Sequence, residues 1–127
     1  MAMRPDLPQD LRRFILTSIP TVPYLEAVLL LRAEPHRSWS SAEVARRLYL
    51  PEPRAAELLA ALASAGVAAQ DDGGCRYAPT TEELAGMLDR LAAHYAVDLV
   101  GVSDLIHSRV DKKAQQFADA FRIRKDS

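Results

Sequence analysis

Cysteine is almost absent from this chain of 127 residues, in which Cys75 is the only one. A single cysteine excludes a disulfide framework within the chain and a cysteine-based zinc site. The longest apolar run, AVLLL at 27–31, is too short to cross a bilayer, and the N-terminus lacks the apolar segment of a signal peptide. We therefore expect no membrane insertion, a reducing cytoplasm as the location, and a core position for Cys75.

An excess of either charge is also missing. The chain has 16 Lys and Arg against 17 Asp and Glu, a net charge of −1, so attraction to a nucleic acid would have to come from a local patch. It has no glycine-rich phosphate loop, no nucleophile beside a base and no paired-carboxylate cleft. His94 and His107 lie too far apart along a helix to share a metal ion. We predict no enzymatic activity, no metal and no cofactor.

What the chain does have is a pattern of helix starts and turns. Ser40 and Glu43 have the spacing of a capping box, Gly66 is a natural helix stop, and DDGG at 71–74 is typical of a hairpin turn. The predicted elements are helices over 7–18, 23–32, 41–48 and 52–65, a short strand at Trp39, and strands over 67–70 and 75–78.

This order predicts a mainly α fold with a small β-hairpin wing. We assign residues 1–19 to an N-terminal amphipathic helix, 20–80 to a winged helix-turn-helix, and 81–123 to a C-terminal helical arm. Apolar residues in the arm recur every eleven residues, which keeps them on one face of a nearly straight helix. We expect a long helix, with a break near 108–111 as the open alternative.

Three stretches, IPTVPYLEAVLLLR, WSSAEVARRL and CRYAPTTEELAGMLDRL, resemble the winged-helix domains of bacterial transcription regulators, broadly of the MarR type. The ending FADAFRIRK resembles small, uncharacterised proteobacterial winged-helix proteins. The broader resemblance covers about residues 20–80. It implies a winged-helix fold, a DNA-binding role in transcription regulation, and dimerisation through the terminal helices.

Double-stranded DNA is the first expected partner. In a helix-turn-helix the second helix enters the major groove, and Arg54 is the residue on the outward row of helix 52–65 that can contact guanine bidentately. Against this, residues 40–80 carry four arginines and five carboxylates, two of them at the tip of the wing. The candidate DNA-binding residues are Ser41, Arg46, Arg47, Arg54 and Arg76.

A protein partner is the alternative, because helix 52–65 has an alanine-rich outer face that suits close helix packing. The arm also carries opposite charges, −4 over 81–108 and +4 over 109–125, and these complementary segments favour a homodimer or an acidic partner. Solvated helix faces and a seam packed within one chain remain open alternatives. The candidate dimer or partner residues are Leu88, Leu91, Tyr95, Leu99, Val102, Ile106, Phe117, Phe121, Arg122 and Arg124.

Overall fold

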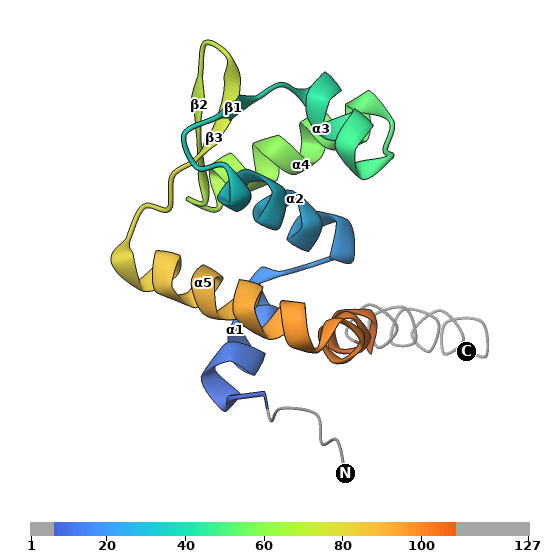
Figure 1. The fold of residues 1–127 in the computed structure, drawn as a ribbon, viewed down its shortest axis with the longest axis vertical. Coiled ribbons are helices and arrows are strands. Elements are labelled where there is room, and N and C mark those ends of the chain that lie inside the picture. Colours follow the sequence, from blue (N-terminus) through green and yellow to red (C-terminus); the bar gives the residue numbers. More distant parts are fainter. Residues whose placement is uncertain (1–6, 109–127) are drawn as a thin grey trace, which may run out of the picture. The chain divides into compact units, whose positions relative to one another are not determined.

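The computed structural model describes residues 7–108. They form a mainly helical fold with a small three-stranded antiparallel sheet (Figure 1). Within this range no single helix is long and apolar enough to cross a membrane. The elements are α1 (Gln9–Ser18), α2 (Val22–Ala33), β1 (Ser38–Trp39), α3 (Ser41–Leu48), α4 (Glu52–Ser64), β2 (Ala68–Asp71), β3 (Gly74–Tyr77) and α5 (Glu82–Val97), and residues 99–108 are also helical.

The chain divides into two compact units. One holds residues 23–92, and the other holds the described residues on either side, 7–22 and 93–108. The division therefore falls within α5, whereas the sequence pattern placed a boundary at residue 80. Most of α5 belongs to the same unit as the sheet.

The core of the unit over 23–92 is built around α2. Leu25, Val28 and Leu31 of this helix are completely buried, as the apolar character of nearly every side of the helix predicts. Leu62 of α4 and Leu88 of α5 are also completely buried. Each such side chain contributes roughly 1.5–3 kcal/mol through removal from water, so these helices hold the unit together.

The sheet has the order β1-β3-β2, with β3 in the centre. The predicted hairpin pairing is confirmed, although both strands are displaced by one residue from 67–70 and 75–78. Gly74 belongs to β3 because it pairs with Asp71. Its φ of +129° and its close approach to the Trp39 carbonyl require a residue without a Cβ at this position. In Figure 1 the hairpin projects from the unit beside β1.

The helical arm differs from the expected long straight helix. α5 ends at Val97, Asp98 is not helical, and a new helix runs over 99–108. Oδ1 of Asp98 accepts a hydrogen bond from the Gly101 backbone N–H at 3.1 Å, which satisfies one of the free donors at the start of that helix. The break predicted near 108–111 lies outside the described residues except for Ser108, which is still helical.

Candidate nucleic-acid interface

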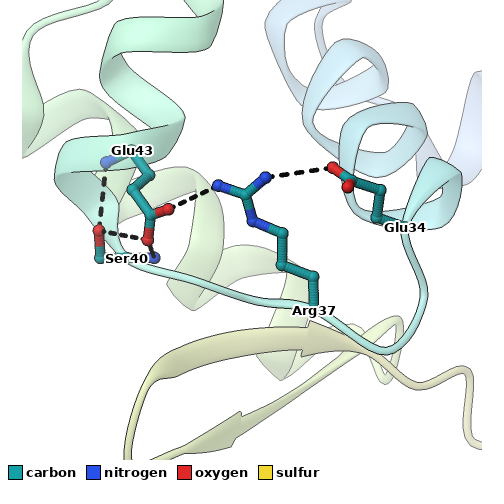
Figure 2. Close-up of polar contacts among 4 residues, drawn as sticks. All are labelled: Glu34, Arg37, Ser40 and Glu43. Carbon is teal, nitrogen blue, oxygen red and sulfur yellow. Dashed lines mark hydrogen bonds and ion pairs between the residues drawn. The ribbon is translucent and has the colours of Figure 1, made fainter.

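The start of α3 is fixed by the predicted capping box (Figure 2). Oγ of Ser40 accepts a hydrogen bond from the Glu43 backbone N–H at 3.2 Å, and the Ser40 backbone N–H donates to Oε1 of Glu43 at 3.1 Å. Two backbone donors at the helix start are thereby satisfied by neighbouring side chains. This local geometry sets where α3 begins relative to β1.

Arg37 extends this cluster in a way that the sequence analysis missed. Its guanidinium donates to Glu43 at 2.6 Å and to Glu34 at 3.2 Å, and its Cζ lies 3.7 Å from the centre of the Trp39 ring. The hydrogen bond from Arg37, with those from Ser40, lowers the pKa of Glu43 to about 2. Arg37 therefore links three elements: the end of α2, strand β1 and the start of α3. Sequence spacing alone does not predict this contact, because it depends on the position of the Trp39 ring.

The turn between α3 and α4 is tight. Tyr49 caps α3 in the left-handed conformation, with φ 57° and ψ 47°, and the Leu50 backbone N–H donates to the Ala45 carbonyl at 2.9 Å. Pro51 and Pro53 then start α4, where proline costs no intrahelical hydrogen bond. α3 and α4 pack directly against each other within the unit (Figure 1).

The five predicted DNA-binding residues are spread over this unit. Arg46 and Arg47 are exposed near the end of α3, and Cζ of Arg47 lies 5.4 Å from the centre of the Trp39 ring. Ser41, in the first turn of α3, lies 3.4 Å from a Glu52 carboxylate oxygen. Arg54 is exposed in the first turn of α4. Four of the five therefore lie on α3 and α4.

Arg54 has a carboxylate partner in the structure. Its guanidinium lies 3.2 Å from Glu57, one turn further along α4, and the two side chains are 43% and 69% exposed. An exposed ion pair of this kind stabilises by only about 0.2–1 kcal/mol. Arg54 can therefore exchange Glu57 for another acceptor at little cost in free energy.

The hairpin places Arg76, the fifth residue, in a different electrostatic setting. Its guanidinium lies 4.0 Å from Asp71. Asp71 also accepts hydrogen bonds from Ser38 Oγ at 2.5 Å and from the Gly73 backbone N–H at 2.9 Å, and the Ser38 bond is the main cause of its lowered pKa. Asp71 is thus a structural residue of the turn, and with Asp72 it makes the tip of the hairpin negative.

A shallow hollow of about 300 Å³ lies beside α4. Ala56 and Ala60 of α4 line it together with Gln70 and Asp71 of β2. Cys75 also lines it but is only 4% exposed, and burial raises the pKa of its thiol. The structure thus gives Cys75 the core environment that was expected, while the alanine face of α4 remains open on this side.

The predicted interface residues of the arm fall into three groups. Leu88, Leu91, Val102 and Ile106 are at most 1% exposed, so the single chain already buries them, as the alternative of an internal seam proposed. Tyr95 is half-buried and Leu99 is 54% exposed. The remaining four, Phe117, Phe121, Arg122 and Arg124, lie outside the described residues.

Metal ligands do not gather in the part of the chain that the structure describes, where no three His, Cys, Asp or Glu side chains meet in a geometry suited to a metal ion.

Comparison with protein-family models, curated proteins and solved structures found no match to this chain. The arrangement of α3, α4 and the hairpin is therefore the basis on which a function can be argued.

Proposed function

We propose that the chain is a winged-helix DNA-binding protein that acts as a dimeric transcription regulator, with α4 as the helix that enters the major groove. The observation that carries the proposal is the α3–α4 pair: two packed helices joined by a tight turn, with Arg46, Arg47 and Arg54 exposed around that turn. A second helix presented in this way suits the major groove.

Arg54 is the proposed base-reading residue. It lies in the first turn of α4, the part of a recognition helix that approaches the base edges. Its guanidinium can donate two hydrogen bonds to the O6 and N7 atoms of a guanine, an interaction that discriminates by about 1–3 kcal/mol. The Arg54–Glu57 ion pair is exposed and therefore weak. Breaking it costs less free energy than the two hydrogen bonds from Arg54 to a guanine contribute.

Arg46 and Arg47 are the proposed phosphate contacts, and Ser41 adds a hydroxyl and a backbone N–H at the start of α3. Contacts of this kind fix the register of a protein on the duplex without reading its sequence. The hairpin contributes less, because Asp71 and Asp72 at its tip repel the phosphate backbone and Arg76 already lies near Asp71. Binding in this proposal depends on the helices rather than on the wing.

A second subunit would double this small number of contacts and set the spacing of two half-sites at about 34 Å. The exposed apolar residues Val97, Leu99 and Val100 give the proposed dimer a surface in the described part of the chain. Sedimentation of the full chain tests this part separately. A monomer at micromolar concentration would leave the DNA-binding proposal standing for single subunits and remove the dimer.

The experiment for DNA binding uses fluorescence anisotropy of a labelled duplex selected from a randomised pool. Arg54→Ala should weaken binding to the selected duplex about 5- to 100-fold and bring it closer to binding of a random duplex. Arg13→Ala is the matched control, since it removes an exposed arginine from α1 and leaves the α3–α4 surface intact. An equal loss in both variants contradicts a base-reading role for Arg54.

A protein-interaction module is the second candidate function, and the hollow beside Ala56 and Ala60 favours it. Small side chains let the backbone of another helix approach closely, and Asp71 at the rim suits a basic partner segment. Ala60→Arg distinguishes the two functions, because it fills this face with a bulky cation. It should strengthen binding to DNA but abolish docking of a partner helix.

A further inference from the structure

Tyr49 has an unusual backbone for its residue type. Among residues 7–108 it is the one non-glycine residue with a positive φ, 57°. Helices often end on a residue in this left-handed conformation, but that residue is usually glycine, because a Cβ crowds the following carbonyl. The backbone of this turn therefore favours glycine, yet the residue at this position is a tyrosine.

Packing does not account for the tyrosine either. Its side chain is 94% exposed, whereas Tyr24 on α2 is 5% exposed. A ring so exposed contributes almost nothing to the core, so substitution should cost the fold nothing. Single exposed apolar residues are common on protein surfaces, but one that also strains the backbone points to a role outside the fold.

The surroundings of Tyr49 are cationic. Residues 45–57 contain Arg46, Arg47 and Arg54 against Glu52 and Glu57, a net charge of +1, and Glu57 is the ion-pair partner of Arg54. All three arginines are exposed. The hairpin turn of the same unit carries Asp71 and Asp72, so the charge of the unit is positive at the α3–α4 turn and negative at the hairpin tip.

The geometry points to Tyr49 as a backbone contact for duplex DNA, with its hydroxyl donating a hydrogen bond to a phosphate at the edge of the groove that α4 enters. The inference rests on the proposed function and adds a residue that carries no charge. Tyrosine hydroxyls are among the groups that position proteins on phosphates. The polyanionic backbone is the occupant that the neighbouring arginines favour.

The test compares Tyr49→Phe and Tyr49→Gly with the unchanged protein, using anisotropy of a labelled duplex at several salt concentrations. Tyr49→Phe keeps the ring and the strained turn but removes the hydroxyl, and should weaken binding about 3- to 10-fold. The dependence of affinity on salt should stay the same, because no charge is lost, whereas Arg46→Ala should reduce the slope by about 0.9. Tyr24→Phe is the matched control, because this tyrosine of α2 is only 5% exposed and belongs to no proposed binding surface.

Tyr49→Gly separates the effect of Tyr49 on the stability of the turn from its proposed contact with DNA. It relieves the left-handed strain, so the urea midpoint of unfolding should rise, while binding to DNA should fall at least as far as in Tyr49→Phe. Binding of both variants within about twofold of the unchanged protein would overturn the contact and leave the proposed function intact. Failure of the unchanged protein to bind any duplex would overturn both.

Discussion

Removal of the hydroxyl that caps α3 should measurably weaken the unit over 23–92. In Ser40→Ala the Glu43 backbone N–H loses its acceptor at 3.2 Å, and the Glu43 carboxylate loses a donor at 3.0 Å. Loss of an N-cap side chain costs about 1 kcal/mol of unfolding free energy, within a range of roughly 0.5–2. With a urea m-value of about 1–2 kcal/mol/M, the midpoint of unfolding should fall by about 0.5–1 M.

Trp39 supplies the assay, because it is the sole tryptophan, is completely buried, and lies next to the cap under the Arg37 guanidinium. Its fluorescence during urea titration follows the unfolding of this unit. Ser41→Ala is the matched control: the neighbouring serine makes only a 3.4 Å hydrogen bond to Glu52, so its midpoint should change little. Equal midpoints for Ser40→Ala and Ser41→Ala would refute the capping account.

The same cluster predicts a dependence on pH. The pKa of Glu43 is lowered from 4.5 to about 2, chiefly by the Arg37 hydrogen bond. A lowered pKa in the folded state gives stability that is complete above the unfolded value and is lost as pH falls through the folded one. The difference in unfolding free energy between the unchanged protein and Glu43→Gln should therefore be constant above about pH 5.5 and shrink as pH falls from 4.5 toward 2. A constant difference throughout would contradict the ion pair.

Further substitutions test the fold. Gly74→Ala should prevent the sheet from forming, because a Cβ there collides with the Trp39 carbonyl at a φ of +129°; an unchanged circular dichroism spectrum and urea midpoint would contradict this. Leu62→Ala, at a completely buried position, should lower the unfolding free energy by about 2–5 kcal/mol, measured by urea titration, and a loss below 1 kcal/mol would argue against its core position. Asp98→Ala should lower stability by about 1 kcal/mol through loss of the cap on Gly101, and a higher melting temperature would contradict a capping role.

The parts of the fold that depend on neighbouring residues were predictable from the sequence. The start of α3 needs only Ser40 and Glu43 at a fixed spacing, and the hairpin needs only the glycine-rich turn at 71–74. The burial of α2 follows from its apolar residues on all sides. In each case the signal lies within a few residues, where periodicity and capping chemistry act.

The features that were missed depend on tertiary geometry or on competition between local signals. The contacts of Arg37 require the Trp39 ring and Glu43 to lie close together in space, and the spacing of these residues in the sequence does not predict that. The break at Asp98 was hidden because the apolar repeat continues through it, so the periodic signal outweighed a single capping residue. Tyr49 ends α3 with a backbone angle that its residue type disfavours, so no local signal marked it.

The central claim is that the surface around the α3–α4 turn binds duplex DNA, and the dependence of that binding on salt tests it most directly. Release of counterions by Arg46 and Arg47, the proposed phosphate contacts, predicts a slope of about −1.8 per bound chain in a plot of log affinity against log salt. Affinity should then fall roughly 12-fold between 50 and 200 mM salt. Absence of binding at low salt, or an affinity that salt does not change, would contradict the account.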